Sequence, residues 1–190
     1  VEYLCPGHGQ TKLGYLWTSC RPRAETIYQW FPSRAAECLE AIIPAAFNGL
    51  IQCDGYSAYD AYGKTHALIV WAGCWAHARR DWFEAREQDP RRSAWVLRQM
   101  QQLYAIEERL RRSGPGPRQR EAVRQAESRP IVQRLGRVFE MWRAKRIFLP
   151  QSGLGKALTY ALNQWQSLQV FLKDGRIEID NNLVENAIRP

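Results

Sequence analysis

The sequence has no long apolar run and no targeting segment. No stretch approaches the roughly 18 apolar residues that a membrane span needs. The first ten residues have neither the basic start nor the apolar core of a secretory signal. The Walker loop, the GxGxxG turn and the GxSxG motif are also absent. These absences argue against a membrane protein, a P-loop or Rossmann nucleotide binder and a hydrolase built on a nucleophile elbow.

Cysteine is too scarce and too irregular for a disulfide framework. The five cysteines are Cys5, Cys20, Cys38, Cys53 and Cys74. An odd number without regular spacing predicts reduced thiols in the cytoplasm, most of them buried as small apolar residues. The pairs Cys5/His8 and Cys74/His77 leave open a joint zinc site, which a zinc measurement on the purified chain would test.

The chain is rich in apolar residues and in arginine. Its 190 residues are 45% hydrophobic and 12% aromatic, which predicts a packed core and excludes global disorder. The formal net charge is +8. Residues 86–146 hold 16 basic and 7 acidic residues, whereas the rest of the chain carries a net charge of −1. This asymmetry indicates a basic insertion in a near-neutral core, either a phosphate-binding surface or an ordinary solvated one.

Apolar periodicity and turn residues predict strands on both sides of a first helix and mostly helices from residue 78 onward. The predicted strands cover residues 14–20, 26–31, 50–53 and 68–71. The predicted helices cover residues 33–43, 56–62, 78–88, 91–112, 118–128, 128–149 and 152–173, with a last one from about residue 182.

Helix ends and charge pairs add detail to this prediction. Ser33 and Ser128 are candidate helix starts. Glu107 and Glu108 lie four residues before Arg111 and Arg112, a favourable spacing for ion pairs on one helix. Together these elements predict an α/β core interrupted by helices.

Asp54 is the first residue that could carry chemistry. It follows a predicted buried strand, where a carboxylate is well placed to hold a metal ion. An Asp-Gly hairpin turn with Gly55 is the alternative, and local sequence favours the turn.

Two further candidates lie near helix starts. Glu185 either points a carboxylate outward from a first helical turn or forms a capping box with Asn182. His77, Arg79 and Arg80 could grip phosphate oxygens, although a solvated basic helix end explains them equally well.

Taken together, the motifs resemble the insertion-sequence-66 family of bacterial DDE transposases. The resemblance covers nearly the whole chain and keeps the order of the family's motifs. The motifs DGY, CWAHARR and DNNxxE are specific in combination. The matching stretches are GYLW (14–17), SRAAECLE (33–40), GLIQCDGYSAY (49–59), GCWAHARRDWFEA (73–85), LGKALTYALNQW (154–165) and DGRIEIDNNLVENAIRP (174–190).

The resemblance implies a ribonuclease H-like catalytic core with a largely helical insertion. Residues 1–85 would form the first part of the core, 86–150 the basic insertion and 151–190 the part that carries the catalytic glutamate. Asp54 and Glu185 would be the second and third metal-binding carboxylates for Mg²⁺ or Mn²⁺. His77 would lie near the scissile phosphate. The expected DNA-binding residues are Arg79, Arg80, Arg118, Arg120, Arg124, Arg134 and Arg137.

One departure from the family bears on activity. No aspartate precedes Asp54, so the family's first catalytic aspartate and first strand are missing, and we expect a truncated chain that is inactive alone. The resemblance implies double-stranded DNA as the partner and a cytoplasmic location in a bacterium. It leaves a homo-oligomer and accessory proteins open. A non-catalytic DNA-binding remnant and a helical interaction domain are the alternative functions.

Overall fold

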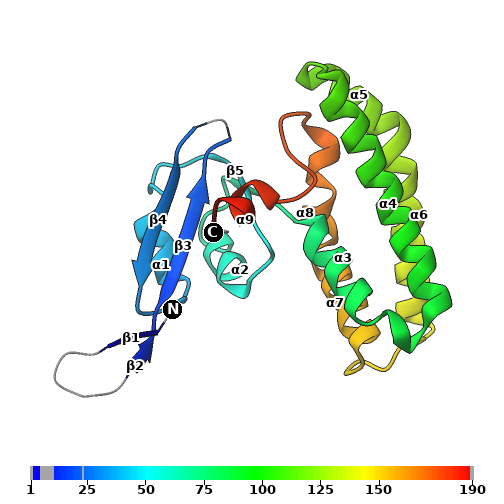
Figure 1. Cartoon of the computed structure of the whole chain (residues 1–190), viewed down its shortest axis with the longest axis horizontal. Coiled ribbons are helices and arrows are strands. Elements are labelled where there is room, and N and C mark those ends of the chain that lie inside the picture. The colour runs from blue at the N-terminus through cyan, green and yellow to red at the C-terminus, as the bar shows by residue number, and fades with distance from the viewer. Residues whose placement is uncertain (1, 5–10, 23, 189–190) are drawn as a thin grey trace. The chain divides into compact units, whose positions relative to one another are not determined.

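The computed structural model describes residues 2–4, 11–22 and 24–188. Its contacts divide the chain into two units. The hairpin unit comprises residues 1–51, 55–70 and 181–190. The helical unit comprises residues 52–54 and 71–180. Figure 1 follows the chain by colour from the strands at the N-terminus to the last helix.

The hairpin unit begins with two antiparallel strand pairs. Strand β1 (Glu2–Leu4) pairs with β2 (Thr11–Leu13), and β3 (Tyr15–Cys20) pairs with β4 (Thr26–Phe31). The β3–β4 pairing joins Tyr15 to Phe31 and Cys20 to Thr26. This pairing confirms the strands predicted at residues 14–20 and 26–31. They form because their aromatic and β-branched side chains suit a pleated surface.

Short elements alternate after the hairpin. They are α1 (Glu37–Ile42), β5 (Gly49–Gln52), α2 (Ser57–Gly63) and β6 (Ile69–Ala72). Strands β5 and β6 pair in a third sheet, so each sheet among the described residues has two strands. The prediction of mixed α/β structure is confirmed. The ribonuclease H-like arrangement stays a prediction, and so does the division at residues 85 and 150.

The start of α1 differs from the prediction. The residue before the helix is Ala36, and the Ser33 hydroxyl instead accepts a hydrogen bond from the Ala35 amide at 3.1 Å. Ser33 therefore stabilises the turn ahead of the helix and is not its N-cap. The helix ends at Ile42, as Pro44 requires.

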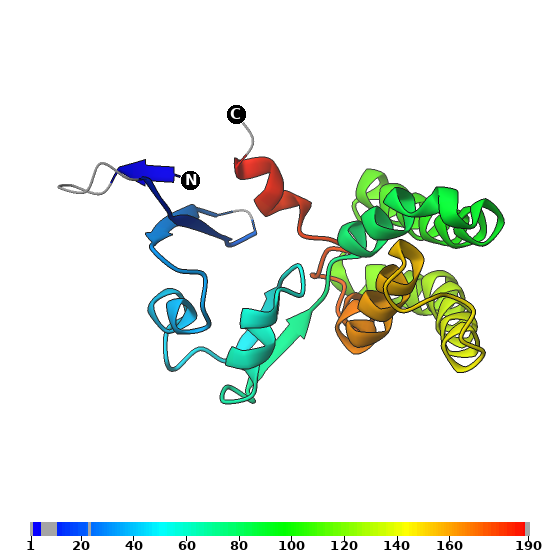
Figure 2. The ribbon, with the colours of Figure 1, turned by 90° about the horizontal axis from the view of Figure 1, so that it is seen from below.

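The helical unit is a bundle of helices. It contains α3 (Trp75–Glu84), η1 (Arg86–Gln88), α4 (Pro90–Ser113), α5 (Pro117–Val123), η2 (Arg124–Ser128), α6 (Arg129–Ala144), α7 (Gly153–Asn163), α8 (Trp165–Leu168) and η3 (Val170–Lys173). Helix α3 packs against α4 and α7, and α6 also packs against both. Figure 2 shows this bundle from a second direction.

Two helix boundaries in the bundle were predicted wrongly. Ser128 does not start a helix, because α5, the π-helical turn η2 and α6 follow one another without a break. The helix predicted over 152–173 is broken at Gln164 and Gln169 into three shorter pieces. Apolar spacing continues across these breaks, which is why periodicity alone did not find them. Ser152 does cap α7, since its hydroxyl accepts from the Gly155 amide.

Aromatic side chains fill the core of the bundle. Trp82 of α3 stacks on Phe139 of α6, with ring centroids 5.3 Å apart. Trp165 meets the edge of Phe139 and lies directly over Gly136, where a Cβ atom would come within 2.7 Å of its ring. The glycine thus makes room for the tryptophan, and α6 and α7–α8 approach closely at this point.

Candidate active site

Asp54 lies two residues after the end of β5 and is not part of a hairpin turn. The Cys53 amide donates to the Ala72 carbonyl at 3.0 Å, and the chain then turns into α2. Gly55 takes a left-handed conformation (φ 78°) that a glycine adopts without strain. The Asp54 side chain is half-buried. The strand-end position is therefore confirmed, and the Asp-Gly hairpin alternative is wrong.

Helices α3 and α7 place further polar side chains near Asp54. The Tyr160 hydroxyl of α7 donates to the Asp54 backbone carbonyl at 2.7 Å. Burial raises the pKa of Tyr160 first, and the charges of Cys74, Asp54 and Asp81 raise it further. Cys74 is buried and immediately precedes α3. Cys74, Asp54 and Asp81 thus all lie within electrostatic range of the Tyr160 hydroxyl in the helical unit.

His77 and Asp81 lie one helical turn apart on α3. His77 is half-buried, and Asp81 is four residues later on the same face. Burial raises the pKa of Asp81, Glu84 raises it further, and His77 and Arg80 partly offset these effects. Asp81 was not predicted as a site residue, although its i+4 spacing from His77 was a usable signal. Tyr160 was not predicted either, because no local signal exists for it.

Glu185 lies in the hairpin unit, on helix α9 (Asn182–Ile188). The amides of Val184 and Glu185 donate to the Asn181 carbonyl at 3.0 and 3.3 Å, which makes Asn181 the N-cap. Asn182 is therefore the first residue inside the helix, and the capping box with Glu185 stays a prediction. The Tyr28 hydroxyl of β4 holds the other end of α9 by donating to the Ala187 carbonyl at 2.7 Å.

The part of the chain that the structure describes contains no cluster of three or more His, Cys, Asp or Glu side chains arranged to hold a metal ion. Cys5 and His8 of the zinc alternative lie outside the described residues. Asp54 and Glu185 belong to different units, and each is placed within its own unit only.

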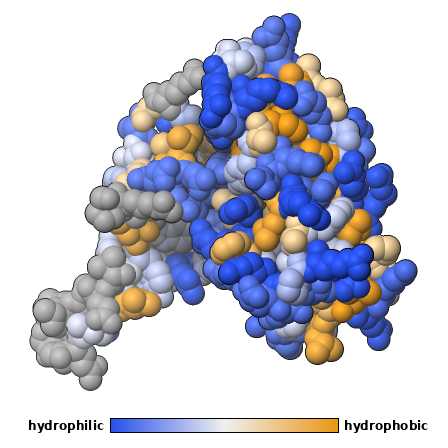
Figure 3. All heavy atoms as spheres, turned by 45° about the vertical axis from the view of Figure 1, so that its right-hand side comes forward, coloured by the Kyte–Doolittle hydropathy of each residue, from blue (hydrophilic) through white to orange (hydrophobic). Residues whose placement is uncertain are grey.

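Most of the arginines expected to bind DNA are exposed. They are Arg79 and Arg80 on α3, Arg118 on α5, and Arg134 and Arg137 on α6. Among the described residues, Arg118, Arg134 and Arg137 form no salt bridge, although Arg134 donates to the Gln99 side chain. Hydrophilic side chains dominate the face drawn in Figure 3.

Arg124 is placed quite differently. Its side chain is fully buried and forms a bidentate pair with the equally buried Glu107, through two hydrogen bonds of 2.7 Å. Its remaining N–H groups donate to the carbonyls of Phe171, Asp174 and Ile177. All five donors of the guanidinium are thus used inside the protein. The expectation that Arg124 contacts DNA is therefore wrong, because the Arg124 side chain has no exposed surface.

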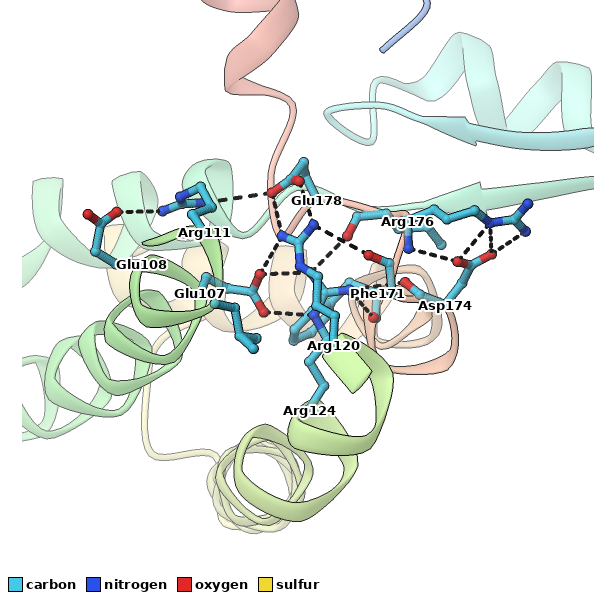
Figure 4. A network of polar contacts seen from close by, with 12 residues as sticks. Glu107, Glu108, Arg111, Arg120, Arg124, Phe171, Asp174, Arg176 and Glu178 are labelled. Atoms are coloured by element: carbon cyan, nitrogen blue, oxygen red, sulfur yellow. Dashed lines mark hydrogen bonds and ion pairs between the residues drawn. The ribbon is translucent and has the colours of Figure 1, made fainter. Parts of the chain in front are cut away.

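Arg120 joins the same network one helical turn earlier. It donates to both carboxylate oxygens of Glu178 and to Glu107, each at 2.7 Å. Only 12% of its side chain is exposed. Burial raises the pKa of Glu178, but the hydrogen bonds from Arg120 together with the charges of Arg120, Arg124 and Arg111 outweigh burial, so that the pKa is lowered. Figure 4 shows these groups pointing toward one another, and Arg120 is likewise no free DNA contact.

The ion pairs on α4 correct a second expectation. Arg112 pairs with Glu108 at 2.9 Å, as the spacing predicted. Arg111 does not pair with Glu107 but lies 3.3 Å from Glu108 and 3.7 Å from Glu178. Glu107 faces inward instead, because it shares the buried face of α4 with Leu103 and Leu110. A charged residue on an otherwise apolar helix face was the signal in the sequence.

Comparison with known proteins places the chain in a family. The model of the family described as "Transposase IS66 family" matches residues 1–190. Uncharacterized protein y4qI of Sinorhizobium fredii is 36% identical over 203 residues, covering 98% of this chain and 36% of that protein. Uncharacterized protein y4jD of the same organism is 32% identical over 201 residues, covering 98% of this chain and 38% of its own length.

The chain thus spans little more than a third of the length of these relatives. No solved structure matches it. The family model covers every residue and these relatives cover 98% of the chain, so the chain belongs to the IS66 family of transposases.

Proposed function

We propose that this chain is part of the catalytic region of a DDE transposase with a ribonuclease H-like core. Such an enzyme cleaves DNA at the ends of an insertion sequence and transfers the 3′ ends to a target. The observation that carries the proposal is the grouping of Asp54 at a strand end with Cys74, Asp81 and Tyr160, in a chain of this family. His77 lies on the same helix as Asp81 and would face a phosphate of the DNA.

The donor chemistry suits Mg²⁺ or Mn²⁺. Asp54 and Glu185 carry carboxylates, the hard oxygen ligands that these ions prefer, and both side chains are partly exposed. A bound ion would stabilise the charge on the attacking and leaving oxygens. Asp54 would hold it at a fixed strand end, with its backbone carbonyl anchored by Tyr160.

Double-stranded DNA is the proposed partner, bound through phosphates. The exposed arginines Arg79, Arg80, Arg118, Arg134 and Arg137 are the proposed contacts. Arg120 and Arg124 leave this set because their charges are satisfied internally. From the family, we expect a cytoplasmic location. Separately, no helix among the described residues is long and apolar enough to cross a membrane.

A salt series tests the DNA proposal. The affinity for a labelled duplex, measured by fluorescence anisotropy, should fall steeply with salt, because bound phosphates release counterions. Arg118→Gln and Arg137→Gln should each reduce the slope of log K against log salt by about 1. Lys156→Gln removes an exposed charge outside the basic segment and serves as the matched control. A duplex affinity independent of salt would favour a helical interaction domain instead.

A cleavage assay separates the enzyme from the DNA-binding remnant. No aspartate precedes Asp54, so we expect the 190-residue chain alone to leave duplex DNA intact in Mg²⁺. Adding a family strand that carries the first aspartate should restore cleavage, and Asp54→Asn or Glu185→Gln should remove it. Cleavage that survives both substitutions would contradict the roles of these carboxylates.

A further inference from the structure

The segment between η3 and α9 has no regular secondary structure. It runs from Asp174 to Asn181 and leads directly into α9, which carries Glu185. A chain without a helix or strand must satisfy its carbonyl groups elsewhere. Most of the partners that it finds come from residues far away in the sequence.

Two arginines of the basic segment, Arg120 on α5 and Arg124 on η2, hold this segment. Arg124 donates to the carbonyls of Asp174 and Ile177, and to that of Phe171 just ahead of the segment. Arg120 grips the Glu178 carboxylate with two hydrogen bonds of 2.7 Å. The approach is tight, since a Cβ atom on Gly175 would overlap the first residue of α5. Figure 4 shows both guanidinium groups directed at this segment.

Residues close in sequence to Asp54 and His77 hold the same segment as well. The Gln52 side chain, two residues before Asp54, donates to the Glu178 carbonyl at 2.8 Å. The Trp75 amide, two residues before His77, donates to the Ile179 carbonyl at 3.2 Å. Glu178 therefore has two connections. Its backbone carbonyl accepts from Gln52 at the end of β5, and its carboxylate accepts from Arg120 on α5.

Four charges meet here with little solvent. Glu107 and Arg124 are fully buried, while the side chains of Arg120 and Glu178 are 12% and 27% exposed. Removing charges from water is costly, and apolar residues of similar size in their place often stabilise a protein equally well. A buried pair of this kind supplies directed hydrogen bonds that apolar side chains cannot, and here they end on the segment before α9.

We propose that Glu107, Arg120, Arg124 and Glu178 are positioning residues, which fix the point where the chain leaves the helical unit and enters the helix of Glu185. The basic insertion would then brace the carboxylate-bearing segment from inside the protein, in addition to any contact with DNA. The importance of this brace for Glu185 rests on the proposed function. The brace itself is measurable without any activity.

Hydrogen exchange on the full 190-residue chain tests the brace. The Ile177 amide donates to Asp174 and the Trp75 amide to Ile179, so both report on the segment. Glu178→Gln keeps the shape but weakens the charge-assisted bonds, and exchange at both amides should become about tenfold faster. Glu178→Asp keeps the charge and should recover part of the protection. Amides in the middle of α4 should not change, which distinguishes local release from general destabilisation.

Two further variants complete the experiment. Arg124→Met should accelerate exchange at the same amides at least as much, whereas Arg112→Gln, which removes an exposed ion pair, should leave them unchanged. Unchanged protection in Glu178→Gln, or equal acceleration throughout α4, would overturn the brace. A chain that shows the local effect but does not bind DNA would overturn the proposed function and leave the brace standing.

Discussion

The buried Glu107–Arg124 pair allows a quantitative stability prediction. In Glu107→Gln, the fully buried guanidinium of Arg124 loses the one carboxylate partner that it has among the described residues and keeps three backbone carbonyls. Arg120 keeps its bidentate contact with Glu178. Removing one member of a buried ion pair costs about 3–5 kcal/mol. Domains of this size are stable by about 5–15 kcal/mol, so the loss is a large part of the total.

The assay is urea unfolding followed by tryptophan fluorescence. Several tryptophans, among them Trp82 in its stack on Phe139, lie in the bundle and report on it. With a slope of about 2 kcal/mol per molar urea, the midpoint should fall by about 2 M. Combining Glu107→Leu with Arg124→Met removes both charges, and this double variant should be less destabilised than the sum of its single changes.

The control is Arg112→Gln, which breaks an ion pair whose arginine side chain is 78% exposed. Exposed pairs of this spacing contribute little to the free energy of unfolding, because solvent screens them. A midpoint for Glu107→Gln that matches this control would refute the reasoning, because it would mean that the buried charge is solvated. Additive effects in the double variant would refute the coupling between the two residues.

Three other predictions concern single residues. Asp89 caps α4 by accepting from the Arg92 amide, and this hydrogen bond lowers the pKa of the Asp89 carboxyl below its ordinary value. Asp89→Ala should therefore cost about 1 kcal/mol at pH 7. Urea midpoints should show that this cost disappears in acid, as the pH falls through the lowered pKa of Asp89. Gly136→Ala should lower the thermal midpoint, since overpacking against Trp165 costs about 1–3 kcal/mol and outweighs the usual helical gain from alanine; a higher midpoint would contradict the close approach. Tyr28→Phe should weaken the anchoring of α9 by about 0.5–1.5 kcal/mol, seen as faster amide exchange in α9 but not in α6.

Local sequence was sufficient for the elements with a strong period. The hairpin of β3 and β4, the strand before Asp54 and the amphipathic faces of α4 and α6 were predicted within a few residues. The helix interruptions at Gln164 and Gln169 were not predicted, because the apolar face continues through them. The start of α1 was also missed, since Ser33 fits a helix cap and a preceding turn equally well.

The candidate site shows the same division. Asp54 could be found from its position after an apolar run, and its motif context supplied the family. The nearness of Tyr160 could not be found, because its hydroxyl reaches Asp54 from 106 residues away. Contacts of this range depend on how helices pack, and no local pattern encodes them.

By itself, the sequence determined the family, the basic character of residues 86–146 and the positions of the candidate carboxylates along the chain. Only the tertiary structure decided which arginines face solvent and which hold the protein together. Arg118 and Arg124 lie on the same continuous helical stretch and look alike in the sequence. They differ because the carboxylate of Glu107 and the carbonyls before α9 meet at Arg124, which makes burial of its charge tolerable.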